Sequence, residues 1–444
     1  MTKDASTQFG QPLSPESKKL VNEVRLKLKE PIHPNFNTDF NIYRFVLNAE
    51  RQFNKSKEVV EYAAKALNNH LRYRRCLHLD EMEDVPFSKN PIFIRRLLPC
   101  GQIQKTTDTN NRLLWYVEYA TISVEGLAST LRSSAACRYQ FWQFEHMLRR
   151  VNEQEEATGR FSSLRHVVDL TGYEINPFEM LFVSSGALSY YSTLFHYEMF
   201  PELVYPVEIV NVARWVHMPY RLIKTVMPAG FADRFRLFDS TFLNELKKEV
   251  KLEDIPETLG GLDKDIRCIS AIKPKPEEHW KPPSEKILAE LETLHISAKK
   301  QKIFKIEVAE NSPRRTLAWY YKTDGDVYFG VFFDPQNNQS SKDKKKEDKE
   351  FFDVENNEMV YPLLKITAKL VHEFDYVDLE RPGTYYAVFC NKHSWLHRRT
   401  VDVMFQTSAV DGTEPRRVYH DGTTSAIEEG ILKSLQLRDF KDYS

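Results

Sequence analysis

The stretch that decides the fold reads FHYEMFPELVYPVEIVNVARWVHMPYRLIKTVMP and covers residues 195–228. Within it, residues 207–212 form a short apolar run, which is typical of a buried strand. Residues 216–227 combine apolar side chains with the basic side chains of Arg221 and Lys224. Proline and glycine flank or interrupt this second segment, so the pattern predicts a short amphipathic helix with chain breakers at its ends.

The chain upstream of this stretch alternates between strand and helix patterns. Leu113–Tyr119 and Leu164–Leu170 have the composition of strands, whereas Thr130–Val151 and Pro177–Phe200 have helical patterns. Strands separated by helices predict crossover connections and a largely parallel or mixed sheet that helices cover. We therefore expect an α/β domain in the middle of the chain.

The first 80 residues predict short helices. A Ser-Pro pair at positions 14–15 is a helix-start signature, apolar residues recur every four positions up to Leu28, and Pro31 closes the run. Two further apolar faces lie within Phe45–Phe53 and Val60–Leu71. These segments are expected to pack on another part of the chain.

The C-terminal part has a different period. Residues 273–284 contain four prolines and predict an extended linker. Between residues 304 and 333 hydropathy alternates with a period of two, and the turn at 323–326 predicts a hairpin. With a further strand after Pro382-Gly383, the pattern predicts an antiparallel β-sandwich, and the polar residues 340–350 predict a solvated loop.

Composition excludes several classes of protein. The 444 residues include 62 basic and 63 acidic ones, so no global field attracts nucleic acid. Five cysteines are far apart without a CxxC pair, which argues against a disulfide framework or a zinc site. The polar N-terminus and the lack of an 18-residue apolar segment give no membrane signal. We expect a soluble cytosolic protein with no metal and no nucleic-acid partner.

The sequence holds no motif typical of an enzyme. It lacks the GxSxG elbow and the glycine-rich phosphate cradles. His166 and Asp169 lie in a predicted strand with no nucleophile at a recognisable spacing. His393 and His397 follow a strand, so they do not share a helix face as zinc ligands would. We expect no catalytic residues and no enzymatic activity.

Several motifs resemble the CRAL-TRIO lipid-binding family. In that family a YPE leads into a strand ending NAP, a helix ending KPF, a short strand and a P…GG, and FPELVYPVEIVNV, FRLFD and IPETLGG fit this order. HVVDLTGYEINP (166–177) and IYRFVLNAERQF (42–53) are similar to its strand end and N-terminal lobe. TLAWYYKTDGDVYFGVFF (316–333) and residues 378–405 resemble a GOLD domain, and the combination is similar to the supernatant protein factor, or tocopherol-associated protein, group.

The resemblance implies a multidomain chain in which a helical lobe and an α/β CRAL-TRIO lipid-binding domain precede an all-β GOLD-like sandwich. The implied boundaries are a helical lobe at 14–80, the CRAL-TRIO domain at 95–262, a Pro-rich linker with a short helix at 263–294, the GOLD-like sandwich at 295–408 and a C-terminal tail at 409–444.

The implied function is to bind one hydrophobic ligand or phospholipid in an apolar pocket under a mobile gate helix, without a cofactor. The protein would carry or present this ligand between membranes or to partners, with transient peripheral membrane association and a protein partner for the GOLD-like part. The alternative is a non-enzymatic signalling or trafficking adaptor that uses both domains for protein docking.

Candidate site residues follow from this resemblance and from their apolar character, although each apolar one is equally compatible with ordinary core packing. Arg221 and Lys224 are the candidate membrane contacts on the outer face of the gate. The candidate pocket and gate residues are Trp115, Val117, Phe141, Phe144, Val168, Leu194, Ile209, Leu222, Ile223, Val226 and Met227.

Three residues are candidates for contact with a polar head group, namely Arg51, Glu202 and Arg234. The phosphatidylinositol-transfer members of the family have a threonine where this chain has Phe231, and a phenyl ring cannot donate a hydrogen bond. Phosphatidylinositol is therefore a doubtful ligand, and Glu202 and Arg234 are equally compatible with an ordinary ion pair. The basic run at 72–75 is expected to be a solvated helix end.

Overall fold

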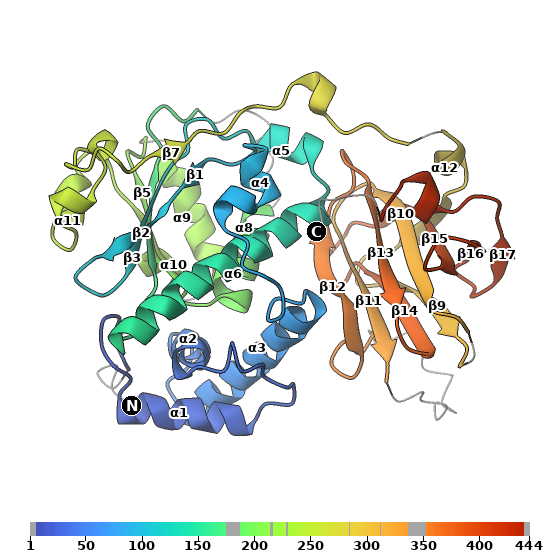
Figure 1. The fold of residues 1–444 in the computed structure, drawn as a ribbon, viewed down its shortest axis with the longest axis horizontal. Coiled ribbons are helices and arrows are strands. Elements are labelled where there is room, and N and C mark those ends of the chain that lie inside the picture. Colours follow the sequence, from blue (N-terminus) through green and yellow to red (C-terminus); the bar gives the residue numbers. More distant parts are fainter. Residues whose placement is uncertain are drawn as a thin grey trace. The chain divides into compact units, whose positions relative to one another are not determined.

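The chain forms two compact units, which Figure 1 draws together. One unit contains Met1–Leu127 and Tyr139–Lys275, and the other contains Ala128–Arg138 and Pro276–Ser444. No described helix is long and apolar enough to cross a membrane. The computed structural model describes residues 6–174, 187–213, 216–227, 230–283, 285–310, 312–335 and 352–438.

Three helices form the N-terminal lobe: α1 (Pro15–Leu26), α2 (Asp39–Glu50) and α3 (Ser56–Cys76). Ser14 caps α1 as predicted, because its side chain accepts a hydrogen bond from the backbone N–H of Ser17. Helix α1 ends at Leu26, before Pro31. The chain turns there because Asn68 of α3 accepts hydrogen bonds from the backbone N–H groups of residues 29 and 30, at 2.8 and 2.9 Å.

A five-stranded mixed sheet forms the centre of the first unit, as predicted. Its order is β2-β3-β4-β5-β6, and only the β2–β3 pair is antiparallel. The predicted strand at 207–212 begins earlier, at Val204. The strands are β2 (Ile103–Thr107), β3 (Leu113–Glu118), β4 (Leu164–Asp169), β5 (Val204–Val210) and β6 (Phe235–Leu237).

Helices lie on both sides of this sheet, with α11 on one side and α6, α8, α9 and α10 on the other (Figure 1). The helix predicted at 130–151 is α6, which begins at Ser133 and continues to Thr158, whereas part of the segment predicted at 177–200 lies outside the described residues. The helices are α5 (Val124–Thr130), α6 (Ser133–Thr158), α8 (Ala187–Thr193), the π-helical η3 (Leu194–Met199), α9 (His217–Val226), α10 (Phe231–Arg234) and α11 (Leu243–Leu246).

Short elements complete the unit and lead to the linker. Strand β1 (Cys100–Gly101) pairs with β7 (Cys268–Ile269). The described residues of the proline-rich linker, 273–283, form no helix or strand apart from the 3-10 turn η7. The other elements are η2 (Phe87–Lys89), α4 (Pro91–Ile94), η5 (Leu252–Asp254), η6 (Glu257–Leu259), η7 (Pro276–Glu278) and α12 (Glu285–Ala289).

One face of the central sheet is sealed by the chain that follows it. Leu114, Tyr116, Val167 and Val210 alternate with residues of the opposite face, and they pack in one buried cluster against apolar residues of the segment 242–266. The Tyr116 hydroxyl also donates to the backbone oxygen of this segment at 2.8 Å. This face is therefore permanent hydrophobic core.

The second unit contains two antiparallel sheets, which confirms the predicted period of two. Their orders are β13-β10-β15-β16-β17, with β8 beside β15, and β12-β11-β14-β9. The strands are β8 (Glu292–Ile296), β9 (Gln301–Val308), β10 (Arg315–Thr323), β11 (Val327–Asp334), β12 (Glu358–Ile366), β13 (Glu373–Leu379), β14 (Gly383–Cys390), β15 (Arg399–Ala409), β16 (Arg416–Val418) and β17 (Thr424–Ala426).

The predicted hairpin at 323–326 is wrong, because β10 and β11 lie in different sheets. Asp324 instead contacts the start of β15, where its side chain accepts a hydrogen bond from the backbone N–H of Thr400 at 3.0 Å. The turn thus connects the two sheets. Aromatic rings from both sheets meet, with Trp319 against Phe329 at a centroid distance of 5.3 Å.

The segment expected to be a C-terminal tail belongs to this unit as far as residue 438. It supplies β16, β17 and helix α13 (Ile431–Ser434). Ile431 and Leu432 are buried in one cluster with Tyr320 and Met404. The polar loop expected at 340–350 lies outside the described residues.

A buried ion network joins the strands of the first unit. Arg165 of β4 donates to both carboxylate oxygens of Glu208 on β5 at 2.8 Å and to Asp108 at 3.1 Å. Arg165 also pairs with Glu249, which follows α11. The Arg165 and Asp108 side chains are 2% and 0% exposed, so the attraction must offset a large loss of hydration.

The Arg165→Leu variant is expected to lose about 3–5 kcal/mol of unfolding free energy, because the buried Glu208 carboxylate loses the cation that binds both of its oxygens. Chemical denaturation followed by circular dichroism measures the loss. Lys248→Ala is the control, since Lys248 pairs with Glu245 at the surface. It should cost no more than about 0.5 kcal/mol. Equal losses in the two variants would contradict this account of the network.

Candidate functional site

The register of the sheet brings four of the candidate pocket residues to one face. Val117 of β3 is paired with Val168 of β4, and Val168 with Ile209 of β5. Trp115 lies two residues before Val117, so it points to the same side. This face, which we call the helix face, is opposite the one sealed by residues 242–266.

The other candidate lining residues are buried in an aromatic cluster contributed by α6 and η3. Phe141 and Phe144 of α6 contact the ring of Phe195 at centroid distances of 5.1 and 5.0 Å. Leu194 is 3% exposed. The structure thus packs these side chains together, and Phe195 is a member of the cluster that the sequence reading did not single out.

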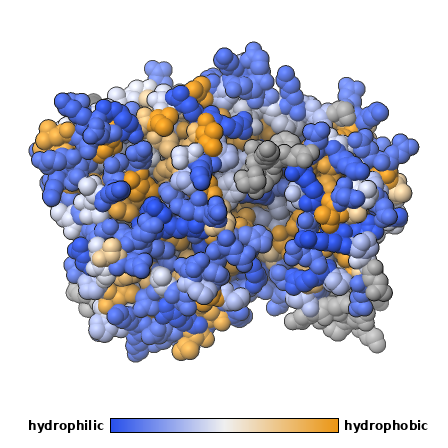
Figure 2. Space-filling view, in the orientation of Figure 1, coloured by the Kyte–Doolittle hydropathy of each residue, from blue (hydrophilic) through white to orange (hydrophobic). Residues whose placement is uncertain are grey.

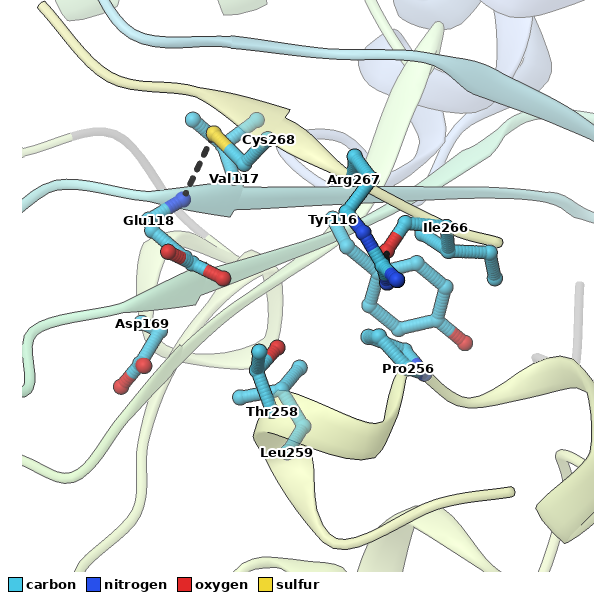
Figure 3. A pocket seen from close by; sticks show the side chains of 10 residues that line it. All are labelled: Tyr116, Val117, Glu118, Asp169, Pro256, Thr258, Leu259, Ile266, Arg267 and Cys268. Carbon is cyan, nitrogen blue, oxygen red and sulfur yellow. Dashed lines mark hydrogen bonds between the residues drawn. The ribbon is translucent and has the colours of Figure 1, made fainter. Parts of the chain in front are cut away.

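Neither of the two best-defined cavities is the predicted apolar pocket. One is only about 10 Å³, room for about one water molecule. Figure 3 shows its lining, in which Val117 is the single candidate residue. Its lining residues are Tyr116, Val117, Glu118, Asp169, Pro256, Thr258, Leu259, Ile266, Arg267 and Cys268.

The second cavity is a groove of about 440 Å³ between the lobe and α6. Arg74 lines it and is saturated by acids, with Asp80 and Glu145 each at 2.7 Å. Arg75 pairs with Glu30 at 2.8 Å. The prediction of a solvated helix end at 72–75 is therefore wrong. Arg74 is only 2% exposed and forms structural ion pairs.

Two histidines on the helix face have ring nitrogens without a hydrogen-bond partner among the described residues. His166 is paired with Trp115 across the sheet and stacks on it at a centroid distance of 3.8 Å. The buried atoms without a partner are Nε2 of His166 and Nδ1 of His196. Burial lowers the pKa of each imidazole to about 3, and for His196 the charge of Arg234 adds to this effect. Both rings are therefore neutral near pH 7.

Sequence reasoning missed this pair as a site. One signal was present, because His166 alternates with the apolar residues Leu164 and Val168 on one face of its strand. His196 lies in the π-helical segment η3, where its ring contacts Phe144 and Phe235 at 5.3 Å. No sequence pattern marked that second position.

The three candidate head-group residues do meet. Arg51 at the end of α2 donates from Nε and Nη2 to the two oxygens of Glu202, at 2.9 and 2.8 Å. Arg234 of α10 donates to the same carboxylate and to the backbone oxygen of His196. Glu202 and Arg234 are 0% and 1% exposed, so we call Arg51, Glu202 and Arg234 the buried ion triad.

Electrostatics hold the triad in its charged form. Burial acts to raise the pKa of Glu202, but the charges of Arg234 and Arg51 outweigh it and hold that pKa below its usual range. Arg44 of α2 donates to the Glu202 backbone oxygen at 3.1 Å, which adds a third cationic side chain to the region. The triad itself carries one positive charge more than negative charge.

The predicted gate segment is helix α9, which presents part of its apolar surface outward. Leu222 is 68% exposed, so it does not line a pocket as expected, and Met218 is 72% exposed. Arg221 and Lys224 are exposed, and Met227 is half-buried. The side chains of Ile223 and Val226 lie outside the described part.

Contacts at the end of the gate link it to β6 and to the triad. The Tyr220 hydroxyl donates to the backbone oxygen of Phe235 at 2.6 Å. Gly230 has φ +79, in the left-handed region that favours glycine, and a Cβ there would lie 3.2 Å from Arg51 Cδ. On the face shown in Figure 2, hydrophobic side chains form small separate groups among hydrophilic ones.

Comparisons with known proteins agree with the α/β architecture. Residues 101–261 match the CRAL/TRIO domain, residues 13–82 match a domain of unknown function, and residues 278–415 match the C-terminal domain of F28H7.8-like proteins. The chain is 25% identical over 381 residues to CRAL-TRIO domain-containing protein F28H7.8 of Caenorhabditis elegans. That alignment covers 85% of this chain and 87% of the relative.

A solved structure was also found, the crystal structure of Sfh5. It covers 62% of this chain and 95% of its own, with 16% sequence identity and a TM-score of 0.35. CRAL-TRIO proteins bind lipophilic ligands and transfer them. The range that matches the CRAL/TRIO domain, residues 101–261, contains the whole β2–β6 sheet and its covering helices.

Proposed function

We propose that this protein binds one hydrophobic ligand on the helix face of the β2–β6 sheet and carries it between membranes or presents it to partners. The observation that carries the proposal is the CRAL/TRIO match at residues 101–261, which spans the whole sheet. Trp115, Val117, Val168 and Ile209 supply the apolar wall. Ligand binding alone is the activity, with no catalytic step and no cofactor.

A ligand must separate side chains that now contact one another. Removing each CH₂ group of a lipid from water supplies about 0.8 kcal/mol, so a chain of ten or more such groups can offset a substantial rearrangement. Helix α9 is the proposed gate, because its flanking Gly230 tolerates a conformation other residues avoid. Its exposed Leu222 and Met218 would enter the bilayer interface beside Arg221 and Lys224.

The polar groups of the site favour an uncharged lipid that carries a hydroxyl or carbonyl group. Neutral His166 and His196 each have a buried ring nitrogen that such a group could satisfy. The ion triad is less suited to a phosphoinositide, because Arg51 and Arg234 already bind Glu202. Phe231 next to Gly230 offers no hydroxyl.

The second unit is proposed to act as a GOLD-like adaptor that keeps the protein near cytoplasmic membranes or partners. The matched C-terminal region of the nematode relative supports a shared role for this unit but names no partner.

The proposal first predicts the lipid content of the purified protein. Organic extracts of the purified protein should contain about one neutral lipid per chain by mass spectrometry, because the wall is apolar and its histidines are uncharged. The Val168→Phe variant should lose at least about nine-tenths of it by filling the helix face. Val167→Phe is the matched control, since Val167 points to the sealed face. Equal lipid loss in both variants would contradict the assignment of the helix face.

Charge reversal on the gate is the second prediction. Arg221→Glu with Lys224→Glu should slow ligand transfer to anionic vesicles about tenfold and make it less sensitive to salt, because an attraction to the surface is lost. Fluorescent lipid transfer measures the rate. Lys247→Glu with Lys248→Glu reverses the same charge at exposed positions near α11 and should have little effect. An unchanged rate in the gate variant would overturn the gate assignment.

The pH dependence of stability is the third prediction. His166 and His196 have folded pKa values of about 3, below the usual 6.5, so below pH 6.5 the unfolded chain binds more protons. Unfolding free energy should fall as pH drops from 6.5 towards 3, by up to about 1.4 kcal/mol per pH unit for each histidine. Urea titrations of His196→Gln should show a correspondingly shallower slope. The same slope in both proteins would show that His196 is not buried and neutral.

A further inference from the structure

The loop between β14 and β15 exposes two adjacent large hydrophobic side chains. Trp395 is 82% exposed and Leu396 is 86% exposed. Side chains of this size bury much of their surface in most folded proteins, so an exposed adjacent pair indicates contact with something outside the chain. We call residues 391–398 the tip loop.

The tip loop is held by an ordered base. Asn391 is 4% exposed, and its Nδ2 donates to the backbone oxygens of Ile296 at 3.1 Å and His397 at 2.9 Å. Ser394 donates to the His397 oxygen at 2.8 Å and closes the loop. Trp395 and Leu396 therefore project from a fixed turn. Because the loop is already ordered, little further conformational entropy is lost when these two side chains bind a partner.

Basic side chains surround the two exposed residues. Lys299 places its Nζ 4.0 Å from the centroid of the Trp395 ring. The segments 297–302 and 391–400, which Asn391 joins, contain six lysines and arginines and no acidic residue. Two acids among the described residues lie beside these segments, where Asp324 contacts Thr400 and Asp326 pairs with Lys365 at 2.8 Å.

We propose that the tip loop is a membrane-docking site, in which Trp395 and Leu396 enter the interface of a bilayer whose anionic head groups are bound by the surrounding basic side chains. Tryptophan prefers the head-group level of membranes, and basic residues beside it are attracted to an anionic surface. This rests on the proposed exchange of ligand with membranes and adds a contact in the second unit, apart from the gate.

The chemistry favours a bilayer over a protein partner. A stable protein interface buries about 800 Å² on each side around an apolar core. Trp395 and Leu396 alone expose far less apolar surface than such an interface needs. Their small apolar surface beside basic residues suits insertion between lipids.

The test is co-sedimentation of the full chain with vesicles of phosphatidylcholine and phosphatidylserine. Trp395→Ala with Leu396→Ala should lower the bound fraction about tenfold, since the inserted apolar surface is lost. Leu370→Ala, at a 52% exposed position in the same unit, is the matched control and should bind like wild type. Lys299→Glu with Lys392→Glu should reduce binding to the anionic vesicles and leave the weak binding to phosphatidylcholine alone unchanged.

Insertion has a direct readout. Lipids brominated in their acyl chains should quench the wild-type fluorescence and quench that of Trp395→Phe distinctly less. If Trp395→Ala with Leu396→Ala binds vesicles as well as wild type, the proposal is overturned. This holds even if the variant no longer binds a protein partner, because the two side chains would then form a protein-docking site. The proposed ligand function can fail separately. If the purified protein contains no extractable lipid but still binds vesicles through Trp395, the proposed lipid-carrier function is refuted and the proposed membrane-docking site is retained.

Discussion

The carboxylate of Glu202 is buried between two guanidinium groups, and this contact fixes how three distant segments of the first unit meet. Arg51 comes from the helical lobe, Glu202 from the turn before β5 and Arg234 from the short helix after the gate. Burial of a charge is tolerated only when partners replace its lost water, so none of the three segments can shift without a cost in free energy. The segment that follows the gate helix thus lies next to a rigid ionic base, with Gly230 against Arg51.

Charged and neutral polar groups occupy different places in this unit. The ion triad lies where the lobe meets the sheet, whereas His166 and His196 lie on the helix face and stay uncharged. Arg234 connects the two places, because it binds Glu202 and the backbone of His196 and also lowers the pKa of the His196 ring. Burial, together with this fixed cation, lowers the pKa of the His196 imidazole and keeps the ring neutral, which matches an apolar wall with a hydrogen-bonding group better than a site for a free anion.

Local sequence signals predicted elements well and their partners poorly. The cap at Ser14 and strands β3 and β4 depend on neighbouring residues, so the sequence located them to within a residue or two. The turn at 323–326 looked like a hairpin because turn composition reports a reversal of the chain and not which strands then pair. Apolar periodicity likewise could not tell that Leu222 is exposed, nor could it tell that Arg74 finds acids 6 and 71 residues away. The ion triad was named through motif resemblance, but its closed geometry required the fold.

The sealed face of the sheet limits how the proposed carrier could take up and release its ligand. Residues 242–266 fill the side that carries Leu114 and Tyr116 with the chain's own core, so the sheet offers a guest one side only. In the proposed carrier, loading and unloading would then share that one side of the sheet and occur one after the other. A carrier built in this way would exchange lipid with one membrane at a time. It would not form a continuous channel through which lipid moves between two membranes.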